Sequence, residues 1–398
     1  VVVTGHHDPK PVDESIYQID VVDSRIMQQR GVNNLAEALA TETSIRLSLD
    51  PATGMSVQMQ GMSGENIKYL VDGVPLTGRV RGNIDLEQIN MENIDHIEIV
   101  KGPMAVQYGT GAIAGVINII TKKNNYFRNM VKANTYVDQK GKYNFGLYGS
   151  AIRGRHTFSL SGNRSLFQGM DIDLNHDEST YPDGQDRYME YKPKRVYNAD
   201  AEYAYKKEDF RISVKSQFMN SLLKDYSNPV ICKTPEEEIT VVAYDADYLT
   251  TRSLSSLTVS DKLGEKSSYN IIGSYTWYGR QTHHITSDLH YLEKEVTDTT
   301  ATQFNNLMTR GSFSYVPGEK LSLLAGWDIN LDNGKGDKID EDAQIGDFAL
   351  FLSGQYSPVK RLTIQPGLRV IYNTKYGAPL IPSMNVHWNI LQNLGWRI

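Results

Sequence analysis

Two stretches of the sequence are unusually rich in aspartate, whose carboxylates are hard oxygen ligands. Their members are Asp171, Asp173, Asp177, Asp183 and Asp186 in the first stretch and Asp225, Asp245 and Asp247 in the second. Ca²⁺ is bound by about six to eight such oxygens, so the two stretches would suit it if they met on neighbouring loops. We therefore predict a calcium site here. Solvated acidic loops that bind no metal are the alternative, as they are for residues 332–342, which lack the full EF-hand spacing.

Two further pairs of side chains could recognise a ligand. Arg79 and Arg81 could bind the carboxylates or phosphate of a ligand, or equally could contact another part of the fold. The adjacent His283 and His284, in a predicted outer loop, could be metal ligands, although paired surface histidines more often have no such role.

Catalytic constellations are missing from the sequence. It contains no HExxH motif, no Gly-x-Ser-x-Gly motif and no cysteine nucleophile with a partner. The single cysteine, Cys232, also excludes a disulfide framework. The glycine-rich residues 109–115 superficially suggest a dinucleotide loop, but they run into a β-branched strand, and no carboxylate follows within residues 116–137. We therefore predict that the protein is not an enzyme and requires no cofactor, apart from the calcium considered above.

The composition narrows the class of protein. The 398 residues include 41 Lys and Arg against 47 Asp and Glu, a net charge of -6, which gives no basic surface for nucleic acid. The longest apolar stretch, residues 111–120, is far shorter than the roughly 20 residues of a membrane helix. The 24 tyrosines and 32 glycines still suit a transmembrane β-barrel, which has aromatic belts and a polar average. The chain opens without Met, so we expect any export signal to have been removed or left out.

Residues before about 125 mix short helices with short strands. A helix is predicted over residues 35–39, with Asn33 or Asn34 as its N-cap. A strand over residues 67–71 ends in the turn dipeptide Asp72-Gly73. The pattern predicts a compact α+β domain, closed by a β-branched strand over residues 116–121.

After residue 125 the chain alternates with a period of two. Tyr197 and Tyr203 bracket small residues on one face, while Asp200 and Glu202 lie on the other, as for a lipid belt and a wet lumen. The same pattern occurs over residues 143–148, 158–161, 210–218, 271–277, 307–315, 321–331, 348–356 and 362–372. Short connections alternate with long ones, such as residues 166–195 and 219–251, which is typical of an outer-membrane barrel. A secreted sandwich or propeller is the alternative, but its inward face would favour Leu, Ile and Val.

Several blocks of the first part, in order, resemble the plug domain of TonB-dependent outer-membrane transporters. They are residues 57–66, 69–76, 94–103, 108–109 and 115–122, and the match spans nearly all of residues 1–123. The second part is more loosely similar to the barrels of siderophore, haem and cobalamin receptors, at residues 366–369 and 378–383. The family often has Arg where Gln60 and Lys101 stand, which puts its usual Arg-to-Glu contacts between plug and barrel in doubt.

The resemblance implies active import of a large scarce nutrient, most plausibly a metal chelate, across the bacterial outer membrane. Ferric siderophore, haem and cobalamin all stay open as ligands. The TonB complex of the inner membrane would supply the energy, and Val1, Val2, Val3, Thr4 and Gly5 are similar to the family's TonB box. This β-branched segment could add a strand to the sheet edge of a partner. The alternative is that it is simply the first strand of the plug.

By the same analogy, the ligand would meet two plug apices, residues 50–55 and 77–83, and the long barrel loops. The implied substrate-binding residues are Asp50, Thr53, Met55, Thr77, Arg79, Arg81, Asn83, His283 and His284. Neither apex carries His, which weighs against a haem receptor with an axial plug histidine. The predicted calcium loops are similar to those of the cobalamin transporter, where Ca²⁺ orders loops between early strands.

The predicted organisation has three parts. Residues 1–10 are the TonB box and linker, residues 11–125 the plug, and residues 126–398 part of a barrel. We count about 12 or 13 candidate strands, whereas plugged transporters use about 22, so we expect further strands outside this chain. Expected partners are TonB, outer-membrane lipid, the chelate and a surface lipoprotein, but no nucleic acid. The alternatives are a passive porin or adhesin, which needs no plug, and a secreted carbohydrate-binding β protein.

Overall fold

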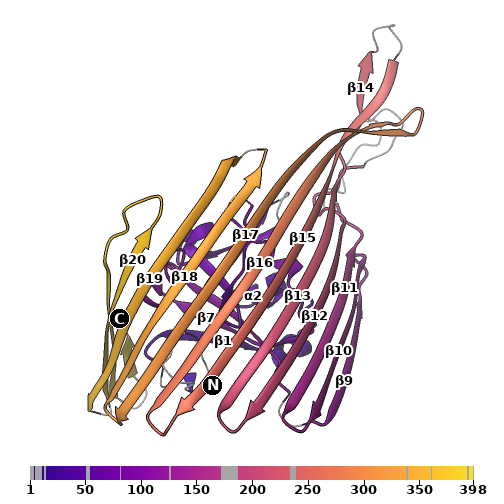
Figure 1. The fold of residues 1–398 in the computed structure, drawn as a ribbon. Helices are drawn as coiled ribbons and strands as arrows, with labels where there is room; N and C mark the ends of the chain where they lie inside the picture. The colour runs from indigo at the N-terminus through magenta and orange to yellow at the C-terminus, as the bar shows by residue number, and fades with distance from the viewer. Residues whose placement is uncertain are drawn as a thin grey trace.

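The computed structural model describes residues 4, 11–12, 15–50, 54–80, 82–124, 127–171, 187–233, 239–337, 339–359, 361–391 and 394–397. Within these ranges the side chains of residues 49, 50, 239, 340–342 and 391 are not described. A small domain lies inside a curved wall of long strands (Figure 1). The described residues include no helix long and apolar enough to cross a membrane.

The inner domain, called the plug below, contains a mixed five-stranded sheet and a smaller three-stranded sheet. The five strands, in spatial order, are β1 (Gln18–Asp23), β7 (Ile94–Lys101), β8 (Gly115–Thr121), β5 (Ile67–Val71) and β6 (Val74–Pro75). The three are β2 (Ile45–Asp50), β3 (Gly54–Met59) and β4 (Met62–Ser63). The helical elements are α1 (Ser24–Gln29), α2 (Leu35–Leu39), α3 (Ala105–Tyr108) and the 3₁₀ turns η2 (Gly64–Asn66) and η3 (Leu86–Gln88). The predicted α+β class of this part is confirmed.

The core of the plug is centred on β8, all of whose residues are buried. It lies between β7 and β5, and its pairing with β5 is parallel. Gly115 begins the strand at φ +148, where an added Cβ would lie 2.1 Å from the carbonyl oxygen of Val100, so no larger residue fits. The predicted helix over residues 35–39 is α2, and Asn34 caps it by accepting a 2.8 Å hydrogen bond from the Glu37 amide.

The wall is one 14-stranded sheet in which every pairing is antiparallel. Its strands are β9 (Asn129–Val137), β10 (Lys142–Arg153), β11 (His156–Phe167), β12 (Lys194–Lys207), β13 (Phe210–Asp225), β14 (Val230–Lys233), β15 (Ile239–Leu263), β16 (Ser267–Asp288), β17 (Glu293–Gly318), β18 (Leu321–Gly336), β19 (Ile339–Val359), β20 (Leu362–Asn373), β21 (Ile381–Leu391) and β22 (Leu394–Arg397). Neighbours in sequence are neighbours in space, and β14 alone pairs off this path, with β15. In the described part, β9 and β22 are edges that do not pair with each other.

The two rims of the wall differ, as in outer-membrane barrels. One rim has short turns, such as residues 208–209 and 264–266, and is called the short-turn rim. The opposite, long-loop rim carries the connections between β11 and β12 and between β13 and β15. There β15, β16 and β17 rise well beyond the other strands (Figure 1). By the convention of such barrels, the long-loop rim is the exterior side.

The period-two pattern correctly placed all the predicted strands, and in β12 the Asp200 side chain faces the plug while Tyr197 and Tyr203 are exposed. The predicted loop over residues 219–251 is wrong. Its described part instead contains the end of β13, β14 and the start of β15. His283 and His284, predicted in a loop, likewise lie on β16. These strand ends lie at the long-loop rim, outside the band that a lipid belt would contact. Apolar and polar residues therefore need not alternate there, and the period-two pattern is lost.

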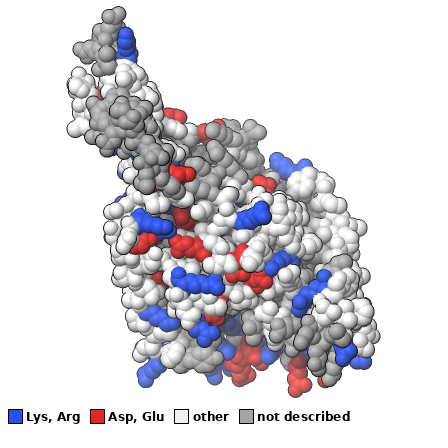
Figure 2. Space-filling view, turned by 180° about the vertical axis from the view of Figure 1, so that it is seen from behind, with Lys and Arg blue, Asp and Glu red and all other residues white. Residues whose placement is uncertain are grey.

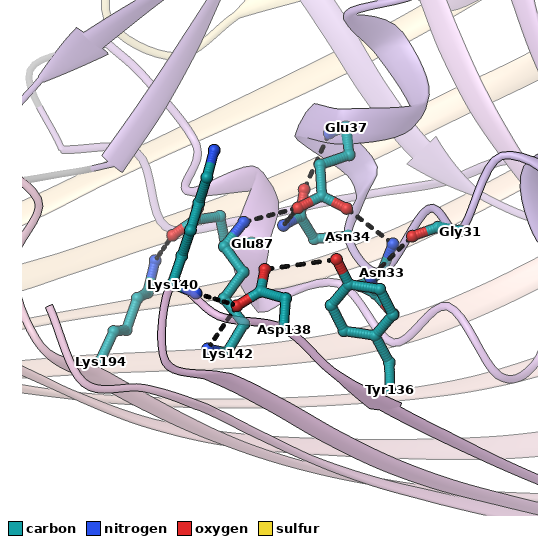
Figure 3. A network of polar contacts seen from close by, with 10 residues as sticks. All are labelled: Gly31, Asn33, Asn34, Glu37, Glu87, Tyr136, Asp138, Lys140, Lys142 and Lys194. Carbon is teal, nitrogen blue, oxygen red and sulfur yellow. Dashed lines mark hydrogen bonds and ion pairs between the residues drawn. The ribbon is translucent and has the colours of Figure 1, made fainter. Parts of the chain in front are cut away.

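Acidic side chains of the plug pair with lysines of the wall. Lys215 Nζ on β13 lies 2.6 Å from Asp72 Oδ2, and Lys142 Nζ on β10 lies 2.7 Å from Glu37 Oε1. Lys194 on β12 binds two carboxylates, Asp85 at 2.6 Å and Glu87 at 2.8 Å. Figure 3 shows the contact with Glu87. In these pairs the plug supplies the carboxylate and the wall supplies the cation, the reverse of the Arg-to-Glu contacts that the family resemblance implied.

Lys101 takes no part in this fastening. It binds Asp20 of β1, in the plug itself, at 2.6 Å. Lys101 therefore does not make the plug-to-barrel contact considered from the sequence. On the face opposite to that of Figure 1, basic and acidic groups also lie interspersed, with no large patch of one sign (Figure 2).

We expect Asp72→Asn to lower the free energy of unfolding at pH 7 by about 1–3 kcal/mol, because Lys215 loses its anion. The thermal unfolding midpoint should fall accordingly. Burial opposes ionisation of Asp72, but the Lys215 ammonium outweighs it and the pKa falls to about 2. This stabilisation is therefore complete above the unfolded-state pKa of about 3.9 and disappears as the pH falls from about 4 to 2. The difference between variant and wild type should shrink over the same interval.

Asn tolerates the left-handed backbone at residue 72, where φ is +49, so the substitution should not strain the turn. The matched control is Asp209→Asn, whose exposed carboxylate lies 3.6 Å from the exposed Lys262. Heat-modifiable mobility and circular dichroism would report the midpoints. Equal midpoints for the two variants would contradict a stabilising role for the Asp72–Lys215 pair.

Candidate functional site

A cavity of about 890 Å³, the outer cavity, lies between the plug and the inner faces of β17–β20. The plug contributes β5, the loop after β6 and the end of α3. The wall residues that matter below are Asn306, Asp328, Asp332, Asp347, Arg369 and Tyr376. The cavity reaches the long-loop rim, since it is also lined by Ile339, the first residue of β19.

Arg79 holds the plug loop that borders this cavity. Its Nη1 donates to the carbonyls of Gly64 and Gly82, both at 2.9 Å, and its Nη2 donates to the carbonyl of Ile67 at 2.7 Å. The guanidinium also lies 5.7 Å from the ring centre of Tyr69. The donors that an anionic ligand would need are therefore bound to backbone carbonyls of the plug. The geometry supports a structural role for Arg79 in this loop.

Two wall carboxylates in the outer cavity have hydrogen-bond partners but no ion-pair partner among the described residues. Asp332 accepts from Asn306 at 2.8 Å, and Asp347 accepts from Asn373 at 2.6 Å. The cations nearby are engaged elsewhere: Lys68 donates to the carbonyl of Tyr108 at 2.6 Å. The outer half of the cavity is therefore electrostatically negative.

A buried charge cluster lies at the inner end of the cavity. Arg310 on β17 and Arg369 on β20 bind the same Oδ2 of Asp328 on β18, at 2.9 and 3.0 Å, and Asp328 is fully buried. Arg310 also lies 4.9 Å from the ring centre of Tyr108. Burial and the charge of Arg310 lower the pKa of the neighbouring Lys68 to about 8. One carboxylate and two guanidiniums thus form a rigid layer against α3.

Thr4, from the segment similar to a TonB box, is docked on the plug. Its amide donates to Glu98 Oε2 at 2.7 Å, and its hydroxyl accepts from Asn118 at 2.8 Å. Burial opposes protonation of His96, but hydrogen bonds to Asp95 and Glu98 raise its pKa to about 9, so the ring is a cation beside Glu98. Thr4 lies in a turn, whereas the alternative interpretation placed it in a strand. Val1, Val2, Val3 and Gly5 lie outside the described residues.

The structure brings only part of the predicted substrate site together. Thr77 and Arg79 border the outer cavity, and the Thr77 carbonyl accepts from Arg252 of the wall at 3.1 Å. Asn83 closes the same loop by a bridge with Val80. Met55 borders a different cavity, of about 220 Å³, near β9 and β10.

The other predicted substrate contacts lie elsewhere. His283 is paired across strands with Asp247, away from the residues lining the outer cavity. Thr53, Arg81 and the side chain of Asp50 lie outside the described part of the chain.

The predicted calcium ligands that the structure describes do not form a metal-binding group. Asp225 pairs with Lys192 at 2.6 Å, and Asp245 pairs with Arg187 at 2.7 Å, so cations neutralise both. Asp225, Asp245 and Asp247 lie on strands, which corrects their placement in a loop. Asp171 is described, but Asp173, Asp177, Asp183 and Asp186 are not. The described residues contain no group of three or more His, Cys, Asp or Glu able to hold a metal ion.

The sequence interpretation missed the wall side of the site. Asp328, Asn330 and Asp332 follow one another at every second position of β18, which places them on one face. That spacing of polar groups in an otherwise apolar strand was a signal for a lumen-facing cluster. The partners Arg310 and Arg369 come from other strands and have no such local signal.

We expect Arg79→Ala to raise amide hydrogen exchange over residues 77–83 in the ligand-free protein by roughly ten- to a hundredfold, because three partly buried carbonyls lose their donor. Arg46→Ala is the control, since Arg46 is an exposed residue of β2. Hydrogen exchange with mass spectrometry measures both. Unchanged exchange in Arg79→Ala, combined with weakened ligand binding, would instead make Arg79 a direct ligand contact.

Comparison with known proteins agrees with this architecture. Residues 11–116 match the family described as TonB-dependent Receptor Plug Domain. The vitamin B12 transporter BtuB of Vibrio cholerae is 32% identical over 124 residues, which are 31% of this chain and 20% of that protein. The ferric enterobactin receptor PirA of Pseudomonas aeruginosa is 32% identical over 155 residues, 34% of this chain and 20% of that protein.

Solved structures match over nearly the whole chain. The ferric enterobactin receptor PfeA of Pseudomonas aeruginosa superposes with a TM-score of 0.75 at 16% identity, covering 95% of this chain and 61% of the other. The siderophore receptor PirA of Acinetobacter baumannii gives 0.72 at 18% identity, covering 96% and 60%. The chain thus spans about three fifths of these structures. Residues 11–116 thus belong to the plug-domain family of TonB-dependent receptors, and the chain as a whole has the fold of the TonB-dependent receptors that it matches.

Proposed function

We propose that the receptor containing this chain actively imports a large scarce nutrient, a metal chelate, across the outer membrane. The observation that carries the proposal is the plug seated against the wall by buried ion pairs, with a ligand-sized cavity on its exterior side. A passive porin would need an open lumen, and the fastened plug argues against one. The outer membrane has no nucleotide supply, so concentrating a scarce ligand requires energy from another compartment.

The N-terminal segment is the proposed attachment point for TonB. Thr4 is held by Glu98 and Asn118, which lie on the adjacent strands β7 and β8 of the plug. A force on this segment therefore acts on the central strands of the plug sheet. Strand addition to the edge of a TonB sheet fits the β-branched residues Val1–Thr4.

The charge of the outer cavity favours a ligand without dense negative charge. Asp332 and Asp347 are unpaired with cations among the described residues, while Arg79 and Lys68 are engaged with backbone carbonyls. Cobalamin, whose periphery consists largely of neutral amides, fits this environment better than a polyanionic ferric catecholate. We place it first among the three ligand classes.

Deleting Val1–Gly5 should leave ligand binding intact and abolish energised uptake. The deletion removes the proposed TonB contact, whereas Thr4, the described residue of the segment, does not line the outer cavity. Equilibrium binding to purified receptor and uptake by intact cells measure the two properties. Shuffling residues 6–10 is the control and should preserve uptake. Undiminished uptake by the deletion variant would refute TonB coupling through this segment.

A binding screen of cyanocobalamin, haem and a ferric tris-catecholate should favour cyanocobalamin. Asp332→Asn and Asp347→Asn should each strengthen catecholate binding by roughly fivefold, since each removes one repulsive charge. Cyanocobalamin affinity should hardly change. Asp209→Asn, far from the cavity and exposed, is the control. Catecholate affinity unaffected by both substitutions would contradict the electrostatic argument.

The same screen with and without a calcium chelator tests the predicted calcium loops. Calcium-dependent cyanocobalamin binding would support a site at residues 171–186, and unchanged affinity after chelation would end that prediction.

A further inference from the structure

Two cavities lie between the plug and the wall and together extend from one rim toward the other. The outer cavity starts at the long-loop rim, where Ile339 and Tyr376 line it. A second, inner cavity of about 340 Å³ lies below it and extends to Arg211 and Ser260, which are close to the turns of the short-turn rim. Tyr108 of α3 lines both cavities. The two spaces are thus separated by about one layer of side chains.

That layer consists of α3 clamped against the charge cluster of the wall. The Tyr108 ring lies 4.9 Å from the Arg310 guanidinium carbon, and Arg369 Nη1 donates to the Val106 carbonyl at 3.4 Å. Val106 also packs with Leu324 and Phe351 of the wall in a small apolar cluster. The barrier is therefore a single helical turn held by one face.

Moving α3 away from the wall would leave no buried charge without a partner. Residues 105–108 include no charged side chain, and Arg310 and Arg369 keep their shared carboxylate, Asp328. On the opposite side of the plug, separation from β10–β13 would leave Lys142, Lys194 and Lys215 unpaired. Because unpaired buried charges are costly, the plug should part from the wall more readily at α3.

The inner cavity suits a polar solute in transit. Its lining includes the hydroxyl side chains Ser213, Ser256, Thr258, Ser260 and Ser312. The charged residues that also line it include Lys123 and two ion pairs, Lys215 with Asp72 and Arg211 with Glu202. The small hydroxyls allow a hydrated ligand to exchange hydrogen bonds as it passes.

The residues that follow the N-terminal segment, Ile16 and Tyr17, also support α3. Ile16 and Tyr17 belong to an apolar cluster with Met104, and Tyr108 packs against this cluster. Gln107 of α3 donates to the Tyr17 hydroxyl at 3.5 Å. A pull on the chain that displaced Ile16 and Tyr17 would therefore remove the packing beneath Tyr108.

We propose that the inner cavity is a second ligand station and that Tyr108 is the barrier between it and the outer cavity. The inference rests on the proposed import function, because it states the route the ligand takes. The ligand passes between α3 and strands β17–β20 once the N-terminal segment is drawn away from Tyr17. The serine-rich wall then receives it on the way to the short-turn rim.

The test is solute leakage through the full-length receptor in proteoliposomes without TonB. Tyr108→Ala should raise the permeation rate of a small sugar, arabinose, severalfold above wild type, because truncating the shared ring joins the two cavities. Tyr108→Phe keeps the ring and should stay closed. Tyr376→Ala makes the same truncation at a ring that lines the outer cavity only, and should also stay closed.

Tyr108→Leu provides a second variant in case the alanine variant does not fold, since it keeps an apolar side chain of shorter reach in the helical turn. It should give a smaller leak than alanine. Wild-type permeation in whichever variant shows native heat-modifiable mobility would overturn the proposal, as would an equal leak from Tyr376→Ala. The leak needs neither ligand nor TonB. A leaking Tyr108→Ala in a receptor that imports nothing would therefore uphold the route and reject the import function, while import without any leak would do the reverse.

Discussion

The fold depends on burying a charged domain inside a polar wall while pairing carboxylates of the plug with lysines of the wall. Lys194 illustrates the constraint, because its buried ammonium reaches two plug carboxylates, Asp85 and Glu87. The strand period of two supplies such groups, since every second side chain faces the lumen while its neighbours face the lipid. The same alternation therefore provides both the membrane surface and the seat of the plug. The main hydrophobic core lies in the plug around β8 and extends to Leu254, Ile272 and Met308 of the wall.

The distribution of the pairs divides the plug surface into two functional sides. Ionic contacts gather along β10–β13, where they fix the position of the plug. Along β17–β20 the contacts are made by guanidiniums with a carbonyl and an aromatic ring, and the outer cavity lies on this side, whereas the inner cavity extends to β12, β13, β15 and β16. The ionic fastening and the outer cavity thus involve different strands of one wall. This separation follows from where the lumen-facing lysines occur in the sequence.

Local patterns predicted the fold well. The α2 helix with its Asn34 cap, the plug strands and the alternating wall strands all depend on neighbours in sequence, which one sequence displays. The region of residues 219–251 was misjudged, because strands beyond the lipid lose the apolar alternation. Most of the site escaped prediction for another reason. Arg79 was read as a ligand contact, although its partners are backbone carbonyls that only the folded loop brings together. The joining of Asp328 to Arg310 and Arg369 likewise depends on strand register.

The lysines of β10, β12 and β13 have a consequence for how such receptors diversify. A change of ligand requires new side chains on β17–β20 and on the plug loop, none of which takes part in the ionic fastening. Substitutions there can accumulate without loosening the seat of the plug. One half of the wall can thus be inherited almost unchanged while side chains of the other half are replaced. A lineage can then bind new nutrients and still keep the ion pairs that hold the plug in the wall.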